Sequence, residues 1–407
     1  MNKSIFCIAA FSAFSFYSSN SNAQSGVTIY GVIDVGYINI KTNGATSLQN
    51  ENTNTIVFGN SAQQTSRLGF KGTEDLGGSV FAFFTLETDM QPANGFLSHW
   101  QDRQSFLGLS VTSLGQFAIG TQNTPIFNQL AASDVGHTNN TPGSAVYPIY
   151  SKGGTRGNGT FDDNAGVGGV SIALTTRTHS TLSFKTAEVS GFTLAGITIF
   201  RSDTLSAQTK TQPILIQDST SGWGVSGQYI QEKFYLGVAY QALKSQNLGY
   251  GCEQPGACPS TAVNPAPKVW ARAEGGVNTQ DNQFYVGATY DFGYFKTYLQ
   301  YINRKATSIL NSSYTLSRSA QQIGLRGFFT TNIESWANLG NGHYASYGVN
   351  NPASKLSAWQ IGANYYLSKR TNLYAIYGAD KVGSTSINSA TGSGLVSSFA
   401  SGVRVQF

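Results

Sequence analysis

Apolar and polar residues alternate with a period of two along most of the chain after Val27. The alternation divides the chain into segments of roughly ten residues, the length that a tilted strand needs to cross the hydrocarbon core of a membrane. The breaks between segments are alternately short and long, and each short break contains turn residues typical of a hairpin. The short breaks lie at 74–78, 113–115, 188–191, 231–233, 291–294, 330–333 and 367–370, and the long ones at about 41–64, 91–101, 123–170, 202–221, 244–280, 304–317, 344–356 and 381–396.

Seven hairpins with one further strand at each end predict sixteen strands. An even number of antiparallel strands can close with both chain ends on the side of the short turns, and closure leaves no unpaired edge. We therefore predict an all-β protein, a transmembrane 16-stranded antiparallel β-barrel with short periplasmic turns and long external loops. An array of soluble β-sandwiches is the alternative, but it does not require a strict alternation of short and long connections.

Composition agrees with strands that cross a membrane. The chain has 46 Gly, 21 Tyr and 25 Phe but only 11% charged residues, which suits strands with aromatic girdles and tight turns. Residues 1–23 have the features of an export signal, with Lys3, an apolar stretch from Ile5 to Tyr17 and a small residue at the cleavage site, Ala23. Nothing after this segment is apolar for the 18 residues that a spanning helix needs. Residues 24–407 are thus predicted to form one barrel.

The charge and the cysteines exclude several kinds of partner. A net charge of +5 is too small to indicate a nucleic acid. Cys252 and Cys258 form a close pair in a Pro- and Gly-rich stretch, and in an exported chain such a pair indicates a loop disulfide. A metal site is the alternative, but the four His are not close to one another in sequence. Neither a metal nor a cofactor is predicted.

Four segments resemble the general-diffusion porins of Gram-negative bacteria. Residues 27–34 (VTIYGVID) resemble their first strand, and 66–77 (SRLGFKGTEDLG), the most specific match, their second strand and first turn. Residues 103–109 (RQSFLGL) resemble the fourth strand, and 402–407 (GVRVQF) the last. The resemblance implies a homotrimer of outer-membrane barrels, each a water-filled channel for passive diffusion of small hydrophilic solutes and ions. It also implies that the third external loop, which here follows Gln122, folds inward to narrow the pore.

Alternation assigns the faces of the second strand. Leu68 and Phe70 are predicted to face lipid, so Arg67 and Lys71 point into the lumen. The opposite assignment would place cations in the membrane at a cost of roughly 2 to 4 kcal/mol each. Asp34 in the first strand is a further candidate for the pore wall.

Two more arginines complete the predicted basic wall. Arg103 should face inward like Arg67, although the alternation then fails at Leu107 and Leu109. Arg177 stands where the family carries a third wall arginine. The chain departs from the family at residues 120–122, which read Gly-Thr-Gln in place of Gly-Arg-Gln, and its third loop lacks the Pro-Glu-Phe-Gly-Gly tip of some relatives.

The third loop should supply carboxylates that face these arginines. Asp134 is the best candidate, with Asp162 and Asp163 further along the loop. Glu87 and Asp89 end the third strand and are predicted to be solvated at the external rim or to lie beside lipopolysaccharide. Opposed charges across a narrow pore create a transverse field that favours polar solutes. Because charged family positions are missing, we predict a mild preference for anions.

The C-terminal strand carries a further signal. Apolar or small residues share one face at alternate positions from Phe399 to Phe407, and the chain ends on an aromatic residue. We expect the outer-membrane assembly machinery to recognise Phe407. Outer-membrane lipid and lipopolysaccharide are the other expected partners of the chain.

Three other functions remain open at this point. A substrate-specific channel would need an aromatic binding site in the third loop, for which Phe127, Tyr147 and Tyr150 are the candidates. An outer-membrane enzyme would need a nucleophile, a histidine and an acid near one rim. His179 lies near Ser180 in sequence, but no nucleophile-elbow pattern is present, so an enzyme is not predicted. An adhesive barrel is the third.

Overall fold

The computed structural model of the protein describes residues 26–46, 50–93, 95–97, 103–148, 175–207, 215–247, 279–309, 312, 315–346, 353–387 and 390–407. Several sequence predictions fall outside these ranges and are not tested by them. They are the export signal at 1–23, the Cys252 and Cys258 pair, and the loop acids Asp162 and Asp163.

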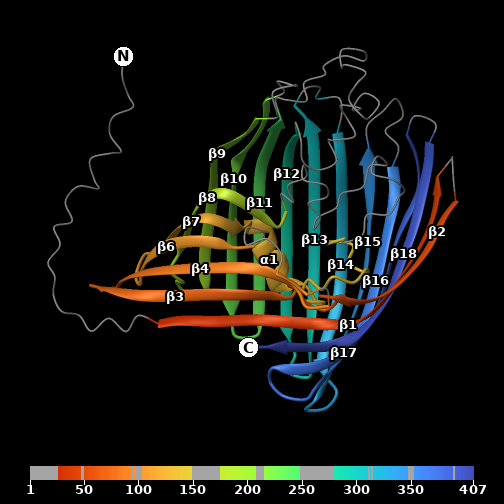
Figure 1. Ribbon diagram of the computed structural model, residues 1–407, viewed down its shortest axis with the longest axis horizontal. Coiled ribbons are helices and arrows are strands. Elements are labelled where there is room, and N and C mark those ends of the chain that lie inside the picture. The colour runs from red at the N-terminus through yellow and green to blue at the C-terminus, as the bar shows by residue number, and fades with distance from the viewer. Residues whose placement is uncertain are drawn as a thin grey trace.

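Antiparallel strands make up nearly all of the described chain, and one short helix lies among them (Figure 1). The helix is too short to cross a membrane. The first half contains β1 (Gly26–Thr46), β2 (Asn50–Asn60), β3 (Arg67–Gly77), β4 (Val80–Gln91), β5 (Phe96–Leu97), β6 (Ser105–Val111), β7 (Gly115–Asn123), α1 (Pro125–Ser133), β8 (Arg177–Thr186) and β9 (Phe192–Ala207). The second half contains β10 (Leu215–Gln231), β11 (Phe234–Asn247), β12 (Thr279–Asp291), β13 (Phe295–Ser308), β14 (Thr315–Phe328), β15 (Ile333–Ser346), β16 (Ala353–Tyr366), β17 (Thr371–Ile387) and β18 (Ala390–Gln406).

Sixteen of the described strands form one closed antiparallel barrel, which confirms the predicted fold class. The other two are not counted as separate barrel strands. β2 pairs with the loop-side half of β1, and β5 pairs only with the end of β4. β1 closes the barrel, since its first half pairs with β3 and its second half with β18. At the seam, the backbone N–H of Gly31 donates to the carbonyl of Phe407 at 3.0 Å, and Phe407 N–H donates back at 3.1 Å.

The described strands confirm the predicted hairpins but extend beyond the predicted lengths. All seven short turns lie where the sequence places them, for example at 232–233 between β10 and β11. On the loop side, however, β1 continues to Thr46 and β17 to Ile387, within stretches predicted as loops. Both strands continue to pair with β18 there, although apolar and polar residues no longer alternate. Backbone hydrogen bonds between extended strands do not depend on that alternation.

The barrel wall alternates between two environments. In β14, Arg318, Gln322 and Arg326 point inward and are buried, whereas Ile323 and Leu325 point outward and are about half exposed, at 51% and 49%. Exposed apolar side chains on the outer face are expected of a strand whose outer solvent is lipid. The side of the short turns carries exposed aromatic residues such as Phe329, as an aromatic girdle at the membrane surface would.

An apolar core forms where the third loop packs inside the barrel. Ile126 and Leu130 of α1 are fully buried with Tyr285 and Ile302 of the wall. The helix lies against β10, β11 and β12, inside the ring of strands (Figure 1). The barrel is therefore filled on one side by its own loop, and the polar lumen lies on the other side.

Candidate functional site

A cluster of charged side chains lines the inner wall at β3, β4 and β6. Glu87 accepts from Arg103 Nε at 3.1 Å, and its other oxygen lies 3.7 Å from Arg67 Nε. Arg103 Nη1 also donates to Asp89 at 3.0 Å, and Tyr30 donates its hydroxyl to Glu87 at 2.9 Å. The two arginine side chains are 22% and 12% exposed, so they are partly accessible from the lumen.

The strand register explains why these groups meet. Arg67 pairs with Asp89 and Gly69 with Glu87, so both carboxylates share the inward face with Arg67. The prediction that both acids are solvated at the external rim is therefore wrong for Glu87, whereas Asp89 keeps 29% of its side chain exposed. Glu87 is only 7% exposed, because the neighbouring arginines replace its water.

Arg103 reaches the lumen from a bend. β6 begins two residues later, so the position of Arg103 is not fixed by the alternation of that strand. Leu107 and Leu109 of β6 point outward, at 60% and 48% exposure. The failure of alternation that the sequence showed is thus resolved, since the two leucines and the arginine do not belong to one continuous strand.

Arg177 and Lys71 extend the basic wall on both sides of the cluster. Arg177 begins β8, opposite Asn123 at the end of β7, and is half-buried. Lys71 is exposed four residues beyond Arg67, with its Nζ 5.4 Å from the ring centre of Tyr30. All four basic residues named from the sequence therefore lie on β3 to β8, on one side of the barrel.

The third loop starts with a helix that the sequence analysis did not predict. Thr124 caps α1 by accepting from the Phe127 N–H at 3.1 Å, and Pro125 occupies the first helical position. The wall makes room with glycines. A Cβ on Gly237 or Gly287 would lie about 2 Å from a side-chain oxygen of the helix, at 2.1 and 2.0 Å. A threonine followed by proline before an apolar stretch is the signal that could have located the helix.

After the helix, the loop lies along the inner wall from β14 to β17 and is held by polar side chains of the wall. Gly143 donates its N–H to Asp380 at 2.8 Å and accepts from Asn338 at 2.7 Å. Further wall contacts include Arg326 to the Val135 carbonyl at 2.8 Å, Gln360 with Asn139 at 2.6 and 3.0 Å, Gln322 with the Ala145 N–H at 3.0 Å, and Arg318 to the Val146 carbonyl at 3.1 Å.

Asp134 does not face the arginines. Its side chain is buried between loop and wall, where it accepts from the Thr138 N–H at 2.7 Å and lies 3.5 Å from Gln322 Nε2. Burial raises the pKa of this carboxyl, and the Thr138 N–H opposes the rise. The predicted loop acid thus lies against the wall, because it satisfies the backbone of its own turn. The exposed positions of the described loop include Ala131, Ala132 and His137.

Asp34 is also buried and does not face the open lumen. It points inward but is fully buried, because its carboxylate accepts the N–H groups of Gln63 and Gln64 at 2.8 and 2.7 Å and the Tyr374 hydroxyl at 2.6 Å. It therefore organises the bend between β2 and β3 and does not line the open lumen. This bend also contacts the third loop, since Asn140 donates its N–H to the Ala62 carbonyl at 3.0 Å.

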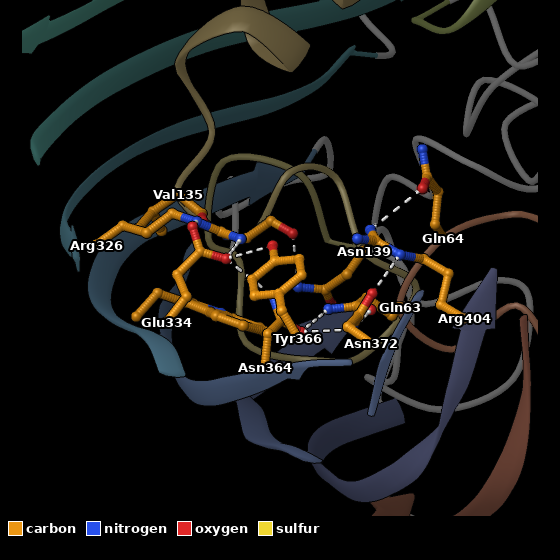
Figure 2. Close-up of polar contacts among 12 residues, drawn as sticks. Gln63, Gln64, Val135, Asn139, Arg326, Glu334, Asn364, Tyr366, Asn372 and Arg404 are labelled. Carbon is orange, nitrogen blue, oxygen red and sulfur yellow. Dashed lines mark hydrogen bonds and ion pairs between the residues drawn. The ribbon is translucent and has the colours of Figure 1, made fainter. Parts of the chain in front are cut away.

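A network of charged and amide side chains lies beneath the bend and the loop (Figure 2). Arg326 forms a two-point ion pair with Glu334, with both N to O distances at 2.7 Å. Glu334 also accepts from Asn364 and Tyr366, each at 2.9 Å. Asn372 donates to Asn364 and to Gln63, each at 3.0 Å, and accepts from Arg404 at 2.9 Å. Sequence reasoning missed this network, because its members are dispersed over several strands.

The described members of the remaining candidates, Phe127, Tyr147 and His179, form neither a reaction centre nor an open aromatic site, and Tyr150 lies outside the described residues. Phe127 and Tyr147 pack on each other with ring centres 6.0 Å apart, and Tyr147 is 4% exposed. His179 hydrogen bonds to Thr121 at 3.0 Å. Within the described ranges, no group of three or more His, Cys, Asp or Glu could hold a metal ion.

A closed barrel with an apolar outer face, a polar lumen and an inward-folded loop defines a membrane channel. The sequence profile of the Gram-negative porins matches residues 8–385, and the chain belongs to this family. It is 24% identical to an outer membrane porin protein of Bordetella pertussis, over 93% of this chain and 94% of that one. The chain is thus a channel protein of the outer membrane, through which small hydrophilic solutes diffuse passively, and not an enzyme.

Two solved structures share the fold. The anion-selective porin from Comamonas acidovorans aligns with a TM-score of 0.64 at 19% identity. The alignment covers 94% of this chain and 100% of that one. A trimer form of OmpT, an outer membrane protein of Vibrio cholerae, aligns with a TM-score of 0.54 at 12% identity, covering 92% of this chain and 99% of that one.

Proposed function

We propose that this porin prefers anions, and that Arg67, Arg103 and Arg177 form the basic side of its constriction. The observation that carries the proposal is an imbalance of charge at the lumen. In the described part of the wall, Arg67, Arg103 and the exposed Lys71 stand beside two carboxylates, Glu87 and Asp89. This part of the wall therefore carries a net positive charge.

The loop supports the same conclusion. Asp134 is the one acidic residue at 124–148, the described part of the third loop, and it is buried against the wall. The loop surface thus offers no described carboxylate to balance the arginines. In a narrow pore with low-dielectric walls, a net positive potential raises the local concentration of anions and lowers that of cations. Pairing with Glu87 and Asp89 reduces the potential, so the preference is mild.

Lys71 adds to this potential at the short-turn side of the cluster. Its amino group is exposed and close to the Tyr30 ring, and no ion pair joins it to a carboxylate among the described residues. An anion that leaves Arg67 toward the periplasm meets Lys71 next. We assign Asp134 and Asp34 a different task, which is to hold the loop and the bend in place.

The ion preference is tested by measuring the reversal potential of single channels in a planar bilayer under a salt gradient. Arg67→Ala and Arg103→Ala should each move the selectivity toward cations, because each leaves Glu87 less compensated. Glu87→Gln should move it further toward anions. Asp134→Asn is the control, since neutralising a carboxyl that does not face the lumen should leave the reversal potential unchanged.

Two results would contradict the proposal. If the arginine variants conduct with unchanged selectivity, these side chains do not line the constriction. If Asp134→Asn shifts the reversal potential toward anions as strongly as Glu87→Gln, the loop acid faces the pore and the transverse field predicted from the sequence is restored. Heat-modifiable migration on gels confirms in each case that the barrel is folded.

The assembly of the protein is part of the same proposal. We propose that residues 1–23 are an export signal, that the assembly machinery reads Phe407, and that three barrels associate as in the trimer form of OmpT. Lipopolysaccharide is the proposed lipid partner at the outer surface. Crosslinking in the native membrane tests the trimer, since a porin that is monomeric there would yield no trimeric band.

A further inference from the structure

The outer wall carries a repeated pair of residues on five strands. An aromatic side chain points outward, and a lysine follows on the same face four residues nearer the long loops. β1, β11, β13 and β17 run toward the loops and β16 runs back, so the order in sequence reverses only in β16. The pairs are Tyr37 with Lys41, Tyr240 with Lys244, Tyr301 with Lys305, Trp359 with Lys355, and Tyr377 with Lys381.

The spacing has a physical meaning at a membrane surface. Outward tyrosine and tryptophan mark the boundary between acyl chains and head groups. Four residues span roughly 13 Å along a strand, and a tilt of about 40° reduces this to roughly 10 Å along the membrane normal. The lysines therefore lie at the level of charged head groups on the side of the external loops.

The cations are closest together on β15, β16 and β17. His343 pairs directly with Lys355 across β15 and β16. Lys381 pairs with Ser357, so it is the diagonal neighbour of Lys355. All three side chains are exposed. The outward positions in the described parts of β13 to β17 include no Asp or Glu, so this patch is complementary to a ligand that carries negative charge.

A hollow lies on the same outer wall between β12 and β15. Its volume is about 520 Å³. Leu299, Ile323 and Leu339 line it and are half exposed or more. Gln321 and Asn341 also line it and hydrogen bond to each other at 3.2 Å. An amide pair facing lipid is costly unless the lipid itself offers polar atoms, and the ester and hydroxyl oxygens near the start of an acyl chain are such atoms.

We propose that one lipopolysaccharide molecule binds this outer wall, with an acyl chain in the hollow and its lipid A phosphates on the lysines above. Lys305 and Lys355 stand on β13 and β16, three strand spacings or roughly 14 Å apart. One phosphate cannot contact both, so a lipid with two phosphates fits better than a phospholipid with one. The site rests on the outer-membrane location of the porin and is independent of its ion preference.

The test compares two triple variants of the full protein. Lys305→Gln with Lys355→Gln and Lys381→Gln removes the site. Lys233→Gln with Lys369→Gln and Arg370→Gln is the matched control, since it removes three exposed charges from the short turns. Native mass spectrometry of the detergent-purified protein measures binding of hexa-acylated lipid A and of the same lipid without phosphates.

The wild type and the control should bind lipid A equally, and the site variant at least tenfold more weakly. Lipid A without phosphates should bind the wild type about as weakly as phosphorylated lipid A binds the site variant. Replacing Gln321 and Asn341 by Leu should lower the affinity about threefold, because only the contacts with the chain are changed. Equal binding by both triple variants would overturn the proposal, as would equal binding of phosphatidylglycerol.

Channel measurements separate this proposal from the preceding one. In bilayers without lipopolysaccharide, the site variant should show the conductance and reversal potential of the wild type, because its lysines lie outside the barrel. A changed reversal potential in that variant would show that these lysines act on the pore, and it would contradict their assignment to a lipid.

Discussion

Replacing Arg326 by Ala is expected to destabilise the barrel and release the third loop. Arg326 belongs to the network in Figure 2, where it joins Glu334 at two points and donates to the Val135 carbonyl. Its guanidinium also stacks over the Trp336 ring, at 4.8 Å from the centroid. The substitution removes all three contacts and leaves the carboxylate of Glu334 with two neutral donors, Asn364 and Tyr366.

The magnitude follows from the burial of the pair. The two side chains are 7% and 9% exposed, and removing one partner of a buried ion pair costs about 3 to 5 kcal/mol. The two remaining donors stabilise the carboxylate, which places the expected loss near the lower end, at about 3 kcal/mol. Replacing both partners, Arg326→Met with Glu334→Gln, should cost less than Arg326→Ala, because no unpaired charge remains.

The assay is equilibrium unfolding in urea of the protein folded into phospholipid vesicles, followed by tryptophan fluorescence. Arg370→Ala is the control, because this arginine is exposed in a short turn and its loss should change the free energy of unfolding by less than about 0.5 kcal/mol. Single-channel recordings of Arg326→Ala should show added current noise from a less restrained loop. A loss below about 1 kcal/mol with quiet currents would refute the reasoning.

Two further substitutions test how the loop and the seam are built. Gly143→Ala should lower the unfolding midpoint and make the current noisier, because Gly143 has a φ of +124° and its Cβ would lie 2.4 Å from the Trp359 carbonyl oxygen; a cost of about 1 to 3 kcal/mol is expected, and unchanged currents would count against it. Gly31→Val should reduce the yield of heat-modifiable barrel, since a Cβ there would lie 2.4 Å from the Phe407 ring; a normal yield would show that the seam tolerates the larger side chain.

The barrel itself could be predicted because each strand repeats the same local signal. Alternation shows which residues face out, and turn residues show where the chain reverses, so no contact between distant strands has to be known. Strand ends on the loop side could not be predicted in this way. In the loop-side ends of β1 and β17 the hydrophobic pattern that identifies a strand disappears, while the strand pairing continues.

The site was less predictable because it depends on contacts between distant parts of the chain. Arg67 could be assigned inward from its strand, but Arg103 sits at a bend where alternation gives no information. The direction of a loop carboxylate is set by whichever donors the fold brings near it. For Asp134 these are the Thr138 N–H and Gln322 of β14, and the second of them lies 188 residues away.

The positions of the acids are consistent with the mild anion preference that we propose for this pore. If every acid of the constriction stood on the loop, the arginine charges would be compensated only across the lumen. Any movement of the loop would then change the selectivity. Here Glu87 and Asp89 compensate the arginines from the adjacent strand, at distances that the β3 and β4 register fixes. The loop is held separately, by wall side chains that bind its backbone, such as Asn338 with the Gly143 carbonyl and Arg326 with the Val135 carbonyl. Selectivity should therefore depend more on wall charges than on loop movement.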